Sequence, residues 1–302
     1  MSLPVTEHLH PASRGLDALP GTDVLRHLLD QQTASLAALA PALPQIEAAA
    51  HLVADCYRAG GRIVYAGAGS SALMAIADGM ELAGTYGIDP ARLVLLMAGG
   101  LPTDARMPGD TEDDAEDGLR AADAIRAGDA VIAVTASGST PYPVAIAQAA
   151  RTKGAKVIAI ANNRGAPIFA GADVTVCLET PPEVIAGSTR MGAGTAQKAA
   201  LNMISTRAGI LLGQVHDGMM VGLRADNAKL VRRATGMVAA IAGVGEAAAA
   251  AALRSAGMAV KPAVLVALGA TAPAAAALLA DTQDNLRAAM ARLQTTGTRK
   301  AG

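Results

Sequence analysis

The sequence predicts an α/β protein built around a five-stranded parallel sheet, with helices before the sheet and a small helical region after it. Five short, almost uninterrupted apolar runs alternate with helical stretches between residues 61 and 180, as strands buried on both faces of a parallel sheet do. Apolar residues recur at helical spacing before the first run. Beyond about residue 236 the chain is rich in alanine and broken by glycine and proline.

The segment 20–59 is expected to form two helices. Leu25, Leu28 and Leu29 lie on one helical face, and prolines at 41 and 44 separate them from a second apolar set that begins at Ile46. Ligand-binding loops are expected at the carboxyl ends of the strands, because right-handed crossovers join parallel strands. The expected strands are RIVYAG (62–67), RLVLLMAGG (92–100), DAVIAVTASG (129–138), AKVIAIANN (155–163) and DVTVCLE (173–179).

A long helix is expected over 194–212, with Gly213 as its C-terminal cap. The uncharged stretch 262–280 reaches the length of a membrane span, but its alanines and prolines favour a buried element of a soluble fold. We therefore expect three segments: helices over 1–60, the main α/β domain over 61–235 and a small helical domain over 236–302. The last is expected to be interrupted at Gly243, Gly245, Pro262, Gly269 and Pro273.

Composition argues against several classes of protein. With 302 residues, of which 52% are hydrophobic and 17% charged, the chain is expected to fold as a globule. Its 25 Lys and Arg balance 26 Asp and Glu and only 2% of residues are aromatic, so no nucleic acid partner is indicated. The first residues lack the pattern of a secretory signal, and Cys56 and Cys177 suit a reducing compartment. We expect a cytoplasmic protein with no membrane partner.

Two loops between a strand and a helix carry candidate anion-binding residues. In the first, Gly69, Ser70 and Ser71 open a helix whose N–H groups can hold an anion, although a glycine-rich tight turn alone also explains them. The sequence after Gly69 does not complete GxGxxG, so no dinucleotide cofactor is expected.

In the second loop, over 135–142, the hydroxyls of Ser137, Ser139 and Thr140 can donate to phosphate oxygens, while Gly138 lets the backbone approach a ligand. The alternative is that Thr140 only caps the following helix.

A third polar segment, over 182–198, joins the last strand to the long helix. Glu183, Ser188 and Thr189 are expected to face a ligand, because so many polar groups are unusual in this chain, although capping by Ser188 or Thr195 explains part of the pattern. His216 is interpreted as a structural histidine. No cluster of His, Cys and Asp has metal-ligand spacing, so no metal is expected.

Two glutamates, Glu81 and Glu112, are each typical of an exposed surface residue when taken alone. Glu112 lies in an acidic run over 110–117 that is typical of a solvated loop, and Glu81 near a helix end is typical of surface decoration. Acid and base chemistry on one substrate needs one protonated and one ionised carboxyl in a single pocket. Taken as a pair, the two glutamates are therefore candidates for the acid and the base of one active site.

The run GSTRMGAGTAQKAALNM (187–203), with EVIAG at 183–187, closely resembles the signature segment of N-acetylmuramic acid 6-phosphate etherases. The resemblance extends in family order over nearly the whole chain. It implies a sugar-isomerase (SIS) fold over 61–235, a homodimer, and catalytic roles for Glu81 and Glu112. It also covers GRIVYAGAGSSA (61–72), ELAGTYG (81–87), MAGG (97–100), TASGSTPY (135–142), Asn227 and Lys229-Leu230.

The chain departs from the family at positions near the expected substrate loops. The family usually has Arg at the positions of Leu73 and Ser139 and Lys at that of Gly192, and residues 78–80 and 83–84 also differ. The reaction type is therefore predicted more firmly than the exact sugar.

By resemblance, the reaction acts on the ring-opened sugar. Glu112 removes the C2 proton, Glu81 protonates the departing lactyl oxygen at C3, and water then adds to give N-acetylglucosamine 6-phosphate and D-lactate. The alternatives are an aldose–ketose isomerase on the same fold and a non-catalytic phosphosugar sensor. Retention of both glutamates argues against the sensor, which needs a phosphate cradle but no acid and base.

Overall fold

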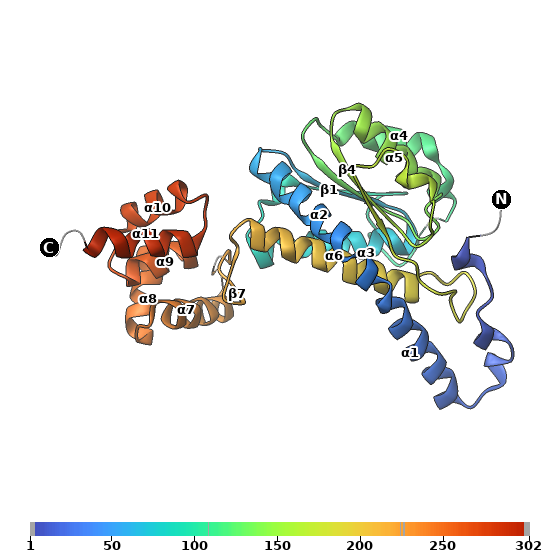
Figure 1. The fold of residues 1–302 in the computed structure, drawn as a ribbon, viewed down its shortest axis with the longest axis horizontal. Coiled ribbons are helices and arrows are strands. Elements are labelled where there is room, and N and C mark those ends of the chain that lie inside the picture. Colours follow the sequence, from blue (N-terminus) through green and yellow to red (C-terminus); the bar gives the residue numbers. More distant parts are fainter. Residues whose placement is uncertain (1–3, 108, 224, 226, 299–302) are drawn as a thin grey trace. The chain divides into compact units, whose positions relative to one another are not determined.

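The protein is described by a computed structural model that covers residues 4–107, 109–223, 225 and 227–298 (Figure 1). Five parallel strands form one sheet in the order β2-β1-β3-β4-β5, which confirms the predicted α/β class and all five predicted strands. The strands are β1 (Ile63–Gly67), β2 (Leu93–Met97), β3 (Ala130–Val134), β4 (Lys156–Ala161) and β5 (Val174–Cys177).

Helices surround the sheet and continue beyond it. Those in the first two thirds of the chain are α1 (Gly21–Ala37), α2 (Leu39–Arg58), α3 (Gly69–Tyr86), α4 (Ala115–Ala121), α5 (Pro141–Thr152) and α6 (Gly192–Leu211). A short hairpin of β6 (Val215–His216) and β7 (Met219–Met220) follows. The remaining helices are α7 (Ala228–Ala242), α8 (Glu246–Ser255), α9 (Val260–Ala267), α10 (Ala272–Asp281) and α11 (Leu286–Thr298).

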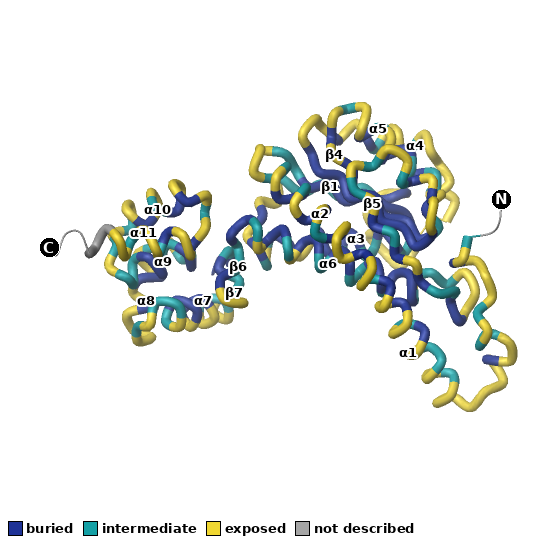
Figure 2. Tube along the Cα trace, viewed as in Figure 1, coloured by how far each residue is buried: buried dark blue, intermediate teal, exposed yellow. Residues whose placement is uncertain are grey.

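The sheet is the middle of three layers. Strand residues alternate between its faces, so Val64 and Val131 pack against Ile146 of α5 on one side. On the other side Tyr65 meets α3, where a side chain at Gly79 would collide with the tyrosine ring. Helices α4 and α5 cover the first face and α2, α3 and α6 the second (Figure 1). The three strands β1, β3 and β4 are buried along almost their whole length (Figure 2).

The chain divides into two compact units. Unit 1 comprises Met1–Met80 and Ala91–Arg207, and unit 2 comprises Glu81–Pro90 and Ala208–Gly302. Within unit 2, α7 to α11 pack around their own apolar core, as expected for the helical region. This division does not test the segments expected over 1–60, 61–235 and 236–302, which stay predictions. The ends of the first and last segment, 1–3 and 299–302, lie outside the described residues.

Element boundaries differ from expectation at two places. Helix α1 ends at Ala37, four residues before Pro41, because the proline ring clashes with the carbonyl of the residue four positions earlier, whereas Pro44 lies inside α2. The C-terminal helices begin at Ala228 instead of about residue 236. The Asn227 side chain accepts a hydrogen bond from Leu230 N at 2.9 Å, and this cap starts α7.

Among the described residues, no single helix has the length and apolar character to cross a membrane; three pairs of consecutive helices, each bent at a short break, reach that threshold together.

A buried carboxylate connects β1, α3 and α6 within unit 1. Asp78 is 2% exposed and accepts hydrogen bonds from the Tyr65 hydroxyl at 2.7 Å, Asn202 Nδ2 at 2.7 Å and Ser205 Oγ at 3.0 Å. Burial raises the pKa of both Asp78 and Tyr65 above their ordinary values. Because a buried carboxylate is costly unless its oxygens are satisfied, these donors fix the position of α3 on the sheet.

Candidate functional site

The strands β1, β2 and β3 end level with one another, so the loops that follow them meet at one edge of the sheet. Gly67 at the end of β1 pairs with Met97 of β2 on one side and with Val134 of β3 on the other. A side chain at Gly67 would approach Ala72 Cα at 3.0 Å, so the turn into α3 needs glycine. This edge carries the first two predicted anion loops and the acidic run.

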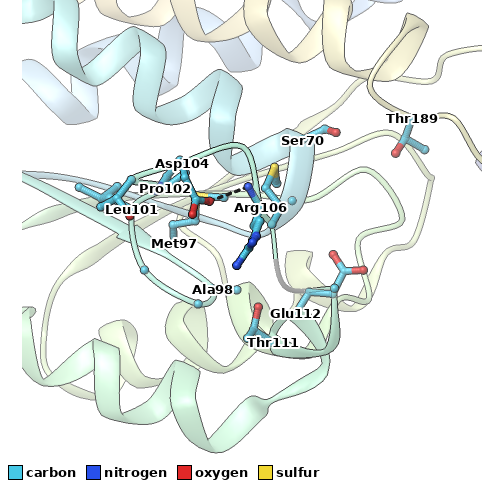
Figure 3. Close-up of a pocket in the computed structure, with 16 residues that line it drawn as sticks. Ser70, Met97, Ala98, Leu101, Pro102, Asp104, Arg106, Thr111, Glu112 and Thr189 are labelled. Carbon is cyan, nitrogen blue, oxygen red and sulfur yellow. Dashed lines mark hydrogen bonds between the residues drawn. The ribbon is translucent and has the colours of Figure 1, made fainter.

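A pocket of about 390 Å³ opens at this edge, entirely within unit 1 (Figure 3). The loop that follows β2 forms most of its wall, and the N-terminus of α3 forms another part. Its lining residues are 69, 70, 97–104, 106, 107, 109, 111, 112 and 189. Of the predicted site residues, the pocket brings together Gly69, Ser70, Glu112 and Thr189.

Glu112 lies in a short 3₁₀ turn, Asp110–Asp113, and reaches the start of α3. Its Oε2 atom lies 3.3 Å from where a Cβ at Gly69 would stand, and Gly69 has a φ of +53°. Although Glu112 keeps one side exposed to solvent, the protein atoms around its carboxyl raise its pKa, and the charge of Asp113 adds to this effect. A carboxylate with a raised pKa is a better match for proton abstraction near neutral pH.

The hydroxyls of the second loop form a cluster at the start of α5. Thr140 Oγ1 lies 2.7 Å from Thr135 Oγ1 and 3.3 Å from Ser137 Oγ. Ser139 donates to Ser137 Oγ through its hydroxyl at 3.3 Å and its backbone N–H at 3.2 Å. Thr140 stands at the N-cap position without a side-chain capping hydrogen bond, so capping does not explain this hydroxyl.

Backbone donors are scarce at this helix end. The first three residues of α5 are Pro141, Tyr142 and Pro143, and only Tyr142 among them carries an N–H. An anion bound here would therefore depend on the hydroxyl cluster more than on the helix N-terminus.

The loop backbone itself is held firmly. Gly138 has a φ of +79°, and a Cβ there would stand 2.2 Å from the Cβ of Ala166. Asn163 Nδ2 donates to the carbonyl of Ala136 at 3.0 Å. These contacts pre-position the hydroxyls.

Glu183 has a structural role that the sequence did not reveal. It is 1% exposed, and its two carboxylate oxygens accept hydrogen bonds from Gly192 N at 2.9 Å and Ala193 N at 2.8 Å. The carboxylate therefore caps α6, where a negative charge also suits the helix dipole. The sequence also allows capping by Ser188 or Thr195, but the Thr195 hydroxyl donates to Gln32 Oε1 at 2.9 Å.

The position of Gly192 explains why this chain has no larger residue there. A Cβ on Gly192 would stand 2.1 Å from Gln31 Nε2 and 2.4 Å from Ser35 Oγ. The first helical segment thus closes over the start of α6.

Glu81 belongs to the same helix, α3, as Gly69 and Ser70, but it does not line the pocket. It is exposed and belongs to unit 2. It follows Gly69 by twelve positions in the sequence. The other predicted binding residues do not line the pocket, and their contact with a ligand stays a prediction. They are Ser71, Ser137, Gly138, Ser139, Thr140, Glu183 and Ser188.

The site residues predicted from the sequence do not include the pocket residues between Met97 and Thr111, among them Asp104 and Arg106. Their position directly after a strand was the available signal. His216 is buried in unit 2, where burial lowers its pKa, and it lines a separate cavity of about 430 Å³ with residues such as Arg287. The described residues contain no group of three or more His, Cys, Asp or Glu placed to hold a metal.

Comparisons with known proteins agree on one family. The SIS domain family matches residues 27–162. The N-acetylmuramic acid 6-phosphate etherase of Deinococcus radiodurans is 40% identical over 296 residues, covering 97% of each chain. N-acetylmuramic acid 6-phosphate etherase 1 of Vibrio cholerae is 39% identical over 289 residues, covering 95% of this chain and 96% of its own.

Among solved structures, that of the protein c3406 of E. coli CFT073, determined as a complex, is 15% identical and has a TM-score of 0.51. The match covers 66% of this chain and 97% of that chain. At this identity the likeness shows the fold alone, and it agrees with the SIS fold that the sequence predicted.

The capping role of Glu183 predicts a loss of stability when its charge is removed. Glu183→Gln replaces one carboxylate oxygen by an NH₂ group, which cannot accept a hydrogen bond from the backbone N–H that it faces. The free energy of unfolding should therefore fall by about 1.5–3 kcal/mol. Glu179→Gln is the matched control, because Glu179 forms an exposed pair with Arg164 and should matter little. Urea denaturation of both variants measures this, and equal losses would contradict the capping role.

Proposed function

The chain belongs to the N-acetylmuramic acid 6-phosphate etherase family, and we propose that it cleaves the C3 D-lactyl ether of N-acetylmuramic acid 6-phosphate. The products are N-acetylglucosamine 6-phosphate and D-lactate, and one water is consumed. The observation that carries the proposal is the carboxylate of Glu112 in a pocket at the carboxyl edge of the sheet. We also propose that the protein acts in the cytoplasm and that 61–235 is its catalytic domain.

The proposed reaction is an elimination followed by hydration. In the open-chain sugar, the C1 carbonyl acidifies the C2 proton, which Glu112 removes. The C2 electron pair forms a double bond to C3 as the C3–O bond breaks, and an acid protonates the departing lactyl oxygen. Water then returns a hydroxyl to C3 and a proton to C2. In the elimination one carboxyl group gains a proton and the other loses one. The proposed steps are proton transfers and the addition of water, and they use neither a metal nor a redox cofactor.

The raised pKa of Glu112 supports its assignment as the base. A carboxylate that holds its proton more tightly accepts one from carbon more readily. Its place beside Gly69, at the first turn of α3, also puts a helix dipole next to the charge that develops in the enolate.

The acid, Glu81, is proposed to come from a second copy of the chain. C2 and the C3 oxygen are neighbours on the sugar, so acid and base must stand within a few ångströms of one substrate, about 3 Å from its reacting atoms. Glu81 is not among the residues that line the pocket of Glu112, and it belongs to the other compact unit of the chain. A homodimer with the same surface on both copies would supply each site with a partner's Glu81.

The phosphate is proposed to bind at the hydroxyl cluster formed by Ser137, Ser139 and Thr140. These hydroxyls lie next to one another and bond mainly among themselves, so each can turn toward an anion. Because two prolines remove backbone donors there, the hydroxyls carry most of the proposed recognition.

The purified protein is expected to release D-lactate from N-acetylmuramic acid 6-phosphate. Activity should survive exhaustive chelation, because the proposed steps use only carboxyl groups and water. An enzymatic lactate assay measures this. Conversion of the sugar without lactate would favour the isomerase alternative, and loss of activity that a divalent ion restores would contradict the two-carboxylate mechanism.

Neutralising the two glutamates should separate their roles. Glu112→Gln should stop both lactate release and exchange of the C2 proton with deuterated water, whereas Glu81→Gln should stop release and leave some exchange. Loss of a general acid or base commonly costs about 10²–10⁴ in rate. Mass spectrometry of the recovered sugar measures the exchange, and the opposite pattern would reverse the assignments.

Mixing these two inactive variants tests whether two chains complete each site. After subunit exchange, a mixed dimer has one site with both native glutamates, so an equal mixture should regain about a quarter of native activity. The Glu112→Gln variant alone, at the same total concentration, is the control. No recovery in dimers shown to be mixed would place both glutamates on one chain.

Removing a hydroxyl from the cluster should weaken binding of the phosphate. Thr140→Val keeps the side-chain shape, and losing a hydrogen bond to a charged group should raise KM by about ten-fold or more. Thr152→Val, at the other end of α5, is the matched control because its hydroxyl donates to Gln148 O at 3.1 Å within the same helix. Steady-state kinetics with N-acetylmuramic acid and its 6-phosphate should show the defect only for the phosphorylated sugar. An equal effect on both sugars would contradict a phosphate site here.

A further inference from the structure

We propose that Arg106 recognises the carboxylate of the lactyl group and thereby selects the etherified sugar over the product. This inference rests on the proposed function. The phosphate does not provide such selection, because substrate and product carry the same phosphate. A group that reads the lactyl substituent is therefore needed near the reacting carbons.

Arg106 stands in the same pocket as the proposed base. It belongs to the loop between β2 and α4, and Figure 3 shows its side chain inside the pocket, between Ala98 and Glu112. Among the described residues that line this pocket, Arg106 is the only one with a permanently positive side chain. Of the anionic groups on the substrate, the one closest to C2 is the carboxylate on the C3 substituent.

The guanidinium is available for a ligand. The backbone N–H of Arg106 donates to Asp104 Oδ1 at 2.7 Å, so the nearby carboxylate of Asp104 bonds the loop backbone. Within the part of the chain that the structure describes, no carboxylate forms an ion pair with Arg106. A planar guanidinium presents two parallel N–H groups, which match the two oxygens of a carboxylate.

The charges around the pocket make such a cation necessary. Asp110, Glu112 and Asp113 follow one another in the turn beside it, and Asp104 lies on the loop. A lactyl carboxylate entering beside these groups would be repelled, by an energy that grows as water is excluded. Arg106 offsets that repulsion at the position of the C3 substituent.

The phosphate is a less suitable partner for Arg106. It is attached at C6, at the other end of the sugar from C2, and the hydroxyl cluster of Ser137, Ser139 and Thr140 does not line this pocket. One sugar can thus place C2 and C3 beside Glu112 and Arg106 and extend its phosphate toward the start of α5.

The test compares Arg106→Gln and Arg106→Lys with a control, Arg120→Gln. Arg120 is a neighbouring exposed cation on α4 that pairs with Asp117 at 3.1 Å and does not line the pocket. For each variant, lactate release gives kcat and KM for N-acetylmuramic acid 6-phosphate, and competitive inhibition gives Ki for N-acetylglucosamine 6-phosphate. The two sugars share the phosphate and differ in the lactyl group.

Arg106→Gln should raise KM for the substrate by about ten-fold or more, while the product's Ki stays within about two-fold of the native value. Arg106→Lys should give a KM between those of the native protein and Arg106→Gln, because lysine keeps the positive charge but lacks the two parallel N–H groups. Arg120→Gln should change neither constant. A parallel rise in KM and Ki would assign Arg106 to the phosphate or to loop structure, and unchanged constants would remove it from the site; both overturn the inference. Absence of lactate release by the native protein would instead refute the proposed function itself.

Discussion

The level ending of β1, β2 and β3 is the constraint on which the rest of the structure depends. Gly67, Met97 and Val134 pair across the three strands, so the chain leaves the sheet at one height three times in succession. The turn into α3, the acidic loop after β2 and the hydroxyl loop before α5 therefore share one edge. Backbone hydrogen bonds of a sheet buried on both faces set this register, and the pocket inherits its position from them.

Two buried carboxylates hold the helices on one face of that sheet. Asp78 receives donors from β1 and α6, and Glu183 receives the first N–H groups of α6. Few charged side chains are buried in this apolar chain, and both are satisfied by hydrogen bonds at defined positions. Because an unsatisfied carboxylate in a core is costly, each allows essentially one arrangement of its helix. The acidic loop of the pocket, by contrast, stays exposed.

The proposed chemistry distributes three tasks over different parts of the fold. Glu112 and Arg106 share a pocket and would act on neighbouring carbons of the sugar, while the hydroxyl cluster would hold the phosphate. The proposed acid, Glu81, is not among the residues that line this pocket. If a partner supplies it, activity depends on assembly, and dilution that separates the copies would silence the enzyme without unfolding it.

The sequence by itself determined the strands, their parallel class and the family, because near-continuous apolar runs and a signature over 187–203 are local features of the chain. It also identified Glu112 and Ser70, which the pocket brings together. Only the tertiary structure showed that Glu183 caps α6, that Thr140 bonds other hydroxyls and that Arg106 enters the pocket. Those roles depend on contacts between residues far apart in sequence or on the path of an irregular loop. A side chain's type states which bonds it can form, but packing decides which partner it meets.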